Sequence, residues 1–155
     1  ARMAEVGYRG YDALLPFHGA EQDAMRFPYT PNWFGVAALY AAASSMLEEG
    51  LDELFARHEA VGRQCREGLA RIGLKLWPRP GAVNSPTVTA VRVPEGVDWP
   101  VWRDSLARRG LVVGGSLGPM AGRVFRLGHM GPQADAARMD MALDVMLEVL
   151  AGPGV

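Results

Sequence analysis

The 155-residue sequence has few of the residues that mark several common protein classes. Its single cysteine, Cys65, excludes an internal disulfide and favours a reducing, cytoplasmic compartment. No apolar run approaches the ~20 residues that a membrane-spanning helix needs, so we expect no membrane partner. The net charge of −1 gives no basic surface for nucleic acid. With only one cysteine, and with His18, His58 and His129 far apart in the chain, we expect no metal site.

Lysine is almost absent as well. Lys75 is the only lysine, and the other basic residues are arginines. It lies in residues 72–77 (IGLKLW), whose alternating apolar pattern predicts a strand directly after a helix. A reaction that needs a covalent bond to a lysine amine therefore has one candidate in this sequence.

The periodicity predicts a connecting segment, residues 1–31, followed by a domain that covers residues 32–155. Glycine and proline recur along the first segment, and its apolar residues follow no regular helical or strand period. We expect helices at residues 32–49, 51–72, 99–109 and 133–150, and strands at residues 74–77, 87–93, 111–113 and 124–127. The sequence thus predicts an α+β fold, a small sheet of about 3–4 strands with helices packed on one face.

A glycine-rich loop and one strand arginine stand out toward the C-terminus. The loop, residues 113–119 (VGGSLGP), contains Gly114 and Gly115, and the strand lies in residues 123–131 (RVFRLGHMG). Arg126 lies among apolar residues that we expect to be buried, and a buried guanidinium needs an anionic partner. Its planar fork suits a carboxylate. That partner is either an internal Asp or Glu, which the local pattern favours, or a ligand.

Other polar residues also have two interpretations. Thr30 precedes the predicted long helix, so its hydroxyl either caps that helix or binds a phosphate there. His58 lies on an apolar helix stripe and is expected to be a core histidine. His129 lies near Arg126 and could approach a substrate or a buried carboxylate.

Several segments together resemble the class V aminotransferases, pyridoxal-phosphate (PLP) enzymes of fold type I typified by serine–glyoxylate and alanine–glyoxylate aminotransferases. In chain order they are residues 28–31 (PYTP), 48–51 (EEGL), 57–58 (RH), 85–91 (SPTVTAV), 93–96 (VPEG), and the glycine-rich loop with its arginine strand. They occur in the family's order and cover nearly the whole chain.

The resemblance implies transamination between a small amino acid of the serine or alanine type and a 2-oxo acid such as glyoxylate. It implies that Arg126 binds the substrate carboxylate, and that Thr30 contacts the cofactor phosphate of the neighbouring subunit in a dimer. Tyr29, Gly114, Gly115 and His129 would have supporting roles. Phe27 stands where the family often has an aromatic hydroxyl.

The resemblance also implies that this sequence is the C-terminal portion of such an enzyme. The family's Schiff-base lysine precedes a stretch that residues 8–12 (YRGYD) resemble, whereas Lys75 corresponds to a strand far from the cofactor. We therefore expect no catalytic residue in this chain, PLP bound mainly by a large domain, and no activity without that partner. Self-association, for example as a homodimer, is also expected. The alternatives are a PLP-dependent lyase or desulfurase of the same fold, or a non-catalytic dimerisation module derived from it.

Overall fold

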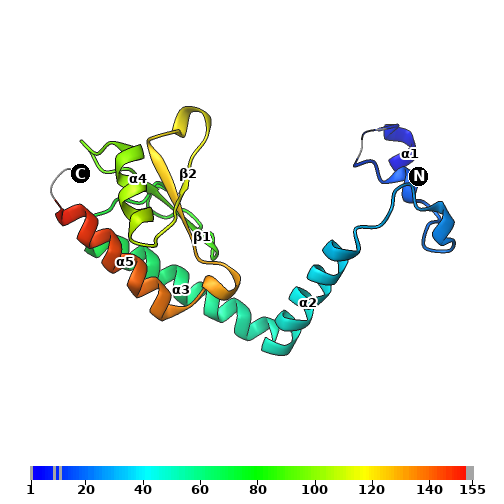
Figure 1. Ribbon diagram of the computed structural model, residues 1–155, viewed down its shortest axis with the longest axis horizontal. Helices are drawn as coiled ribbons and strands as arrows, with labels where there is room; N and C mark the ends of the chain where they lie inside the picture. The colour runs from blue at the N-terminus through cyan, green and yellow to red at the C-terminus, as the bar shows by residue number, and fades with distance from the viewer. Residues whose placement is uncertain (1, 9, 11, 153–155) are drawn as a thin grey trace. The chain divides into compact units, whose positions relative to one another are not determined.

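The computed structural model describes residues 2–8, 10 and 12–152, and it divides the chain into two compact units, Ala1–Glu48 and Glu49–Val155 (Figure 1). The sequence analysis expects a boundary after residue 31, with the long helix in the C-terminal domain, and this boundary stays a prediction.

The N-terminal unit contains α1 (Arg2–Val6), 3-10 turns at Leu15–Phe17 and Ala24–Arg26, and the long helix α2 (Trp33–Glu49). Phe17 contacts the rings of Phe27 and Tyr29, with centroids 6.2 Å apart in both pairs. The side chain of Asn32 accepts a hydrogen bond of 3.0 Å from the Gly35 amide, so Asn32 caps α2. This segment is therefore folded locally, although its sequence has no regular period.

The segment of residues 8–12 is only partly described. The hydroxyl of Tyr8 donates to Asp12 over 2.6 Å. Arg9 and Tyr11, which contribute to the family resemblance there, lie outside the described residues.

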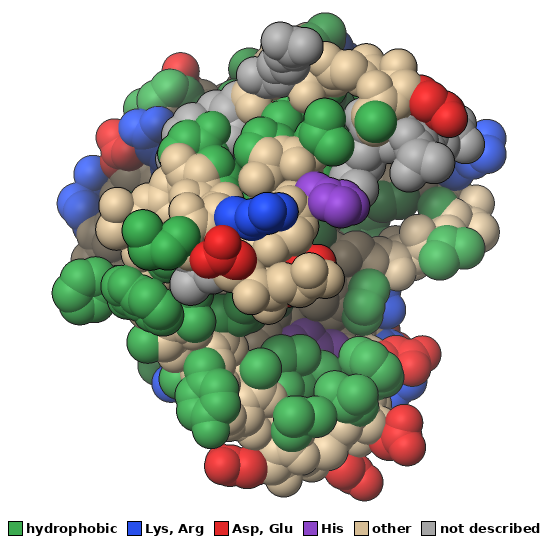
Figure 2. Space-filling view, turned by 90° about the vertical axis from the view of Figure 1, so that its right-hand side faces the viewer, with side chains coloured by type: hydrophobic (Ala, Val, Ile, Leu, Met, Phe, Trp, Pro, Cys, Tyr) green, Lys and Arg blue, Asp and Glu red, His purple; other side chains and the backbone are tan. Residues whose placement is uncertain are grey.

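Helix α2 exposes large apolar side chains. Trp33 is 69% exposed and Phe34 is 91% exposed. Val36, Leu39, Tyr40 and Leu47 are exposed too. No residue of α2 is buried by the described part of the chain. Figure 2 likewise shows many hydrophobic side chains on the surface, with charged side chains scattered among them.

The C-terminal unit alternates helices with a small sheet. Its elements are α3 (Leu51–Arg71), β1 (Val88–Arg92), α4 (Trp99–Arg108), β2 (Gly114–Gly115), β3 (Val124–Gly128) and α5 (Ala136–Ala151). Asp98 caps α4 and Asp135 caps α5, each through its carboxylate and a backbone amide of the first turn. None of the described helices is long and apolar enough to cross a membrane.

The sheet has three antiparallel strands in the order β1-β3-β2. In the register, Arg126 of β3 lies between Ala90 of β1 and Gly114 of β2. The α+β class, the size of the sheet and the helices on one of its faces agree with the predicted fold (Figure 1).

Two predicted strands differ in the structure. Residues 74–77 form only one bridge, Leu76 to Val91, beside β1. Residues 111–113 form no strand, and pairing begins at Gly114. The backbone amide of Leu111 instead donates a hydrogen bond of 3.1 Å to the Leu106 carbonyl, and this bond closes the end of α4.

The core lies between the sheet and helices α3, α4 and α5. Phe125 and Trp102 are fully buried, and their rings meet edge to face with centroids 4.8 Å apart. Leu69, Leu106 and Met146 complete the innermost layer. This packing fixes β3, and with it the side of the sheet on which each β3 side chain lies.

Candidate functional site

Arg126 lies on the face of the sheet opposite the core. Its neighbours Phe125 and Leu127 are buried, whereas Arg126 itself is exposed. Its Nε and Nη2 atoms both donate to the Gly115 carbonyl, over 3.0 and 2.7 Å. One edge of the guanidinium is thus held by the backbone of β2.

The predicted burial of Arg126 is wrong. Strand alternation directs this side chain to the uncovered face, so its charge does not need an internal partner. No described acidic residue forms an ion pair with it. The internal salt bridge that the local pattern favoured is therefore absent from the described part of the chain.

The remaining edge of the guanidinium is suited to a carboxylate. Nε and Nη2 face Gly115, which leaves the pair of N–H groups at the Nη1–Nη2 end directed outward. Two parallel donors of this kind bind a carboxylate bidentately. Ala90 and Gly114, the cross-strand neighbours of Arg126, are small and leave room beside it.

Gly115 has little free space on its core side. A Cβ atom at this position would lie 3.3 Å from Cζ2 of Trp99, which is tighter than an ordinary contact. The Trp99 ring stacks on Phe125 with centroids 5.9 Å apart. The sequence analysis missed this link between the core and the orientation of Arg126, since Trp99 carries no local signal for contact with a loop sixteen residues later.

His129 is in the core and not at an open site. It is fully buried, its Nδ1 lies 3.1 Å from the Pro86 carbonyl, and its Nε2 lies 2.9 Å from the Thr89 hydroxyl. Because a carbonyl only accepts, Nδ1 carries the proton and Nε2 accepts from Thr89. Burial lowers the pKa of His129. This neutral histidine joins β1 and the loop before it to the end of β3.

Arg57 and His58 form hydrogen bonds with the loop that follows β3. Arg57 Nη1 donates to the carbonyls of Gly131 and Ala134, both over 2.8 Å, and its other nitrogens donate to Glu49. His58 Nε2 accepts from the Gly131 amide over 2.9 Å, and its Nδ1 donates to the Leu54 carbonyl over 2.7 Å. His58 is therefore a core histidine, as predicted.

Thr30 and Tyr29 belong to the N-terminal unit. Thr30 is exposed, and its hydroxyl makes no hydrogen bond to a described residue, because Asn32 takes the capping position of α2. Tyr29 contacts Phe17 through its ring. The hydroxyl of Thr30 is thus available to a ligand oxygen.

Lys75 is at the edge of the sheet, exposed, with its ammonium 4.0 Å from the Glu95 carboxylate. Cys65 is buried, and burial raises the pKa of its thiol. Among the described residues, no group of histidine, cysteine, aspartate or glutamate side chains is arranged to hold a metal ion.

Comparison with known proteins identifies the relatives of this chain. It is 38% identical over 109 residues to the pyridoxamine–pyruvate transaminase of Mesorhizobium japonicum, covering 70% of this chain and 28% of that enzyme. It is 40% identical over 106 residues to the serine–glyoxylate aminotransferase of Methylorubrum extorquens, covering 68% of this chain and 26% of that enzyme. No family model matches the sequence.

A solved structure shows the same relationship. The ureidoglycine–glyoxylate aminotransferase of Bacillus subtilis superposes with a TM-score of 0.81 at 28% identity, covering 90% of this chain and 36% of that one. The chain is homologous to the C-terminal portion of class V aminotransferases. The aminotransferases of this family depend on PLP. The chain spans less than a third of the length of the two curated relatives described above.

Proposed function

We propose that this chain provides the substrate-carboxylate site of a class V aminotransferase. The observation that supports this most strongly is the outward-facing Nη1–Nη2 edge of Arg126, oriented by the Gly115 carbonyl on an uncovered face of the sheet. The homology to PLP-dependent aminotransferases indicates which carboxylates it would meet.

The proposed reaction moves an amino group from a small amino acid, of the serine or alanine type, to a 2-oxo acid such as glyoxylate. Donor and acceptor both carry a carboxylate next to the reacting carbon, so one arginine serves both halves of the reaction. By holding that carboxylate at two points, Arg126 fixes the orientation of the bonds at the reacting carbon. The bound PLP supplies the electron sink.

The described residues fit one cofactor contact. We propose that the Thr30 hydroxyl donates to a phosphate oxygen of the PLP bound in the neighbouring subunit of a dimer, with Tyr29 beside it. Lys75 is exposed and paired with Glu95, which does not suit a lysine that holds the cofactor. The cofactor lysine would come from the large domain, and these 155 residues alone would be inactive.

Two other functions are compatible with the same fold. A PLP-dependent lyase or desulfurase would also use a carboxylate site, and a dimerisation module would need none. The relatives reported above are named as aminotransferases, which favours transamination.

The test is Arg126→Lys in the assembled enzyme, in which this chain is combined with a class V large domain. Lysine keeps the charge but loses the two-pronged geometry, so the affinity for amino and 2-oxo acids should fall by about 1–3 kcal/mol. The PLP absorbance should not change. Arg63→Lys, at an exposed arginine of α3, is the control and should leave both unchanged. Unaltered substrate affinity in Arg126→Lys would refute the proposed role.

A further inference from the structure

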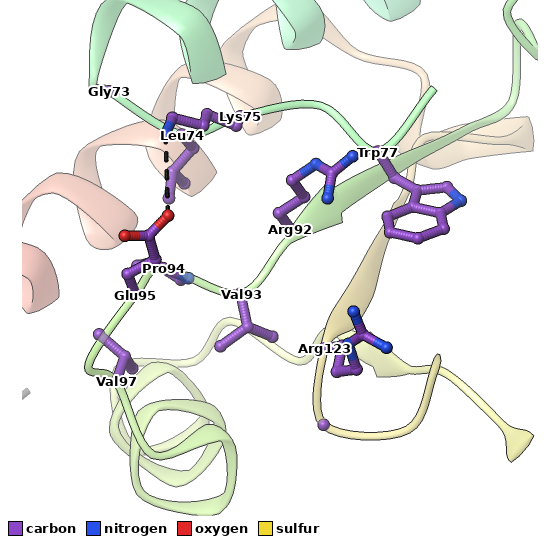
Figure 3. A pocket seen from close by; sticks show the side chains of 11 residues that line it. Gly73, Leu74, Lys75, Trp77, Arg92, Val93, Pro94, Glu95, Val97 and Arg123 are labelled. Atoms are coloured by element: carbon purple, nitrogen blue, oxygen red, sulfur yellow. Dashed lines mark ion pairs between the residues drawn. The ribbon is translucent and has the colours of Figure 1, made fainter. Parts of the chain in front are cut away.

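We propose that a basic pocket at the edge of the sheet binds a small oxyanion that carries two or more negative charges, such as a diphosphate or a tricarboxylate. The cavity has a volume of about 460 Å³, within the range of small-molecule sites. It lies between residues 73–77, the end of β1 with the loop after it, and residues 122–123 (Figure 3). It includes neither Arg126 nor Thr30, so the proposal goes beyond the function proposed above.

The charges of the pocket are unbalanced. Lys75, Arg92 and Arg123 line it, and among the described residues that line it Glu95 alone is acidic. Arg92 and Arg123 form no ion pair with any residue that the structure describes. The chain as a whole has a net charge of −1, so this local excess of positive charge is not an average property of its surface.

The ion pair between Lys75 and Glu95 is weak. Its two side chains are 78% and 100% exposed and meet at 4.0 Å, a geometry that contributes little to stability. Lys75 can therefore turn toward an anion in the pocket. Glu95 would then be left in water, which costs little because it is already fully exposed.

Arg92 is held in position for an anion. Its guanidinium carbon lies 4.6 Å from the centre of the Trp77 ring, a cation–π contact that reduces the number of conformations it would lose on binding. The backbone beneath is fixed, since the Arg92 amide bonds to the Lys75 carbonyl and the Trp77 amide bonds to the Ala90 carbonyl. A guanidinium fork with a fixed base is suited to phosphate or carboxylate oxygens.

The backbone of Arg123 is hydrogen-bonded to the residues that follow β1. Its carbonyl accepts from the Val93 amide over 3.0 Å, which joins the loop before β3 to the end of β1. In Figure 3 the side chains of Arg92, Trp77 and Arg123 lie toward one end of the pocket, and Lys75 and Glu95 toward the other. Because the cationic side chains lie at two ends of one pocket, they suit an anion that carries two or more charged groups at a distance from each other.

The experiment titrates the full chain with inorganic pyrophosphate and, separately, with citrate. Binding is measured by calorimetry and by the NMR signal of the Trp77 indole N–H, assigned with Trp77→Phe. We expect saturable binding with a dissociation constant of about 1 mM or tighter for at least one of the two anions. The comparison between them shows whether phosphate or carboxylate oxygens are preferred.

Matched variants distinguish binding at this pocket from nonspecific attraction of the anion to positive charge elsewhere on the chain. Arg92→Ala and Arg123→Ala should each weaken binding about tenfold or more, because a charge-assisted hydrogen bond is lost. Arg63→Ala removes the same charge from the exposed surface of α3 and should change binding less than about twofold. If Arg92→Ala lowers stability, Arg92→Lys is used in its place. This variant retains the charge but loses the guanidinium fork, so it should also weaken binding.

Three results would overturn the proposal. They are no saturable shift of the Trp77 signal with either anion, equal weakening by Arg63→Ala and Arg92→Ala, and an acidic peptide that binds more tightly than both small anions. The last result would assign the pocket to docking of a protein segment.

Discussion

Single residues of this chain take their roles from the face of the sheet on which they lie. The sequence identified Arg126 as the residue to examine, and its neighbours Phe125 and Leu127 are buried as expected. The same alternation that buries them directs Arg126 outward, where the Gly115 carbonyl orients it. The site therefore depends on one charged side chain and on one backbone carbonyl.

His129 makes stability depend on pH. Burial lowers its pKa in the folded state, so at a pH below its ordinary value of about 6.5 the unfolded chain binds more protons than the folded chain. The free energy of unfolding should therefore fall as the pH is lowered from 7 through 6.5 toward the folded pKa. The slope contributed by one histidine is at most about 1.4 kcal/mol per pH unit.

The measurement is urea unfolding of the chain and of His129→Asn at several pH values between 5 and 7. We expect the asparagine variant to be less stable at pH 7 and to have a smaller dependence on pH in this range. If both proteins lose stability equally as the pH falls, another group is responsible for the dependence.

At the level of elements, β2 connects the core to the site. Its two glycines occupy different surroundings, since a Cβ atom at Gly115 would lie 3.3 Å from Trp99, whereas one at Gly114 would lie 3.6 Å from the Arg126 guanidinium. Only the first is tighter than an ordinary contact. The two positions thus form a matched pair for substitution.

We predict that Gly115→Ala lowers the free energy of unfolding by about 1–2 kcal/mol, because Trp99 or the strand must shift. In the assembled enzyme the same change should raise KM for the amino acid, since the carbonyl that orients Arg126 moves with the strand. Gly114→Ala should change stability by less than about 0.5 kcal/mol. Urea unfolding of both variants and steady-state kinetics of Gly115→Ala test this, and equal losses of stability at the two glycines would contradict it.

The elements also show what could be predicted from the sequence. The caps Asn32 and Asp98, helices α2 to α5 and strands β1 and β3 follow from local patterns. Residues 111–113 were predicted as a strand from their apolar side chains, but the Leu111 amide is used by α4. Strand pairing requires backbone amides and carbonyls that are not already hydrogen-bonded. A pattern of side chains does not show which backbone groups are already used.

Contacts between distant elements could not be predicted for a similar reason. Arg57 and His58 were identified as a pair on a helix, but their bonds to the loop at Gly131 join residues more than seventy positions apart. The Gly115 carbonyl that orients Arg126 likewise lies in a strand with little free space beside Trp99, a residue of another element. The sequence therefore singled out Arg126, the residue of the proposed carboxylate site, but it predicted neither the exposure of this side chain nor the contacts that support it.

At the scale of the whole molecule, the exposed apolar side of α2 is the main unexplained surface. Val36 and Leu39 lie three positions apart on this helix, so they share a face, and both are exposed. Large apolar surfaces are unusual on monomers. We propose that this helix contacts a partner chain, and that in the isolated 155-residue chain a second copy takes this place.

The isolated chain should therefore self-associate at micromolar concentration in a sedimentation experiment. The double variant Val36→Ser and Leu39→Ser should weaken association about tenfold or more, because it removes apolar surface from the contact. Val83→Ser, at a fully exposed loop valine of the C-terminal unit, is the control and should have no effect. A monomeric wild-type chain would contradict this account of α2.

The role of Arg126 is tested most directly by comparing two substrates of the assembled enzyme, an amino acid and the amine that lacks its carboxylate. If Arg126 binds that carboxylate, Arg126→Lys should lower kcat/KM for the amino acid about 10- to 100-fold and leave the value for the amine nearly unchanged. The preference of the enzyme for the amino acid should shrink by the same factor. Equal losses with both substrates, or no loss with either, would show that Arg126 does not recognise the substrate carboxylate.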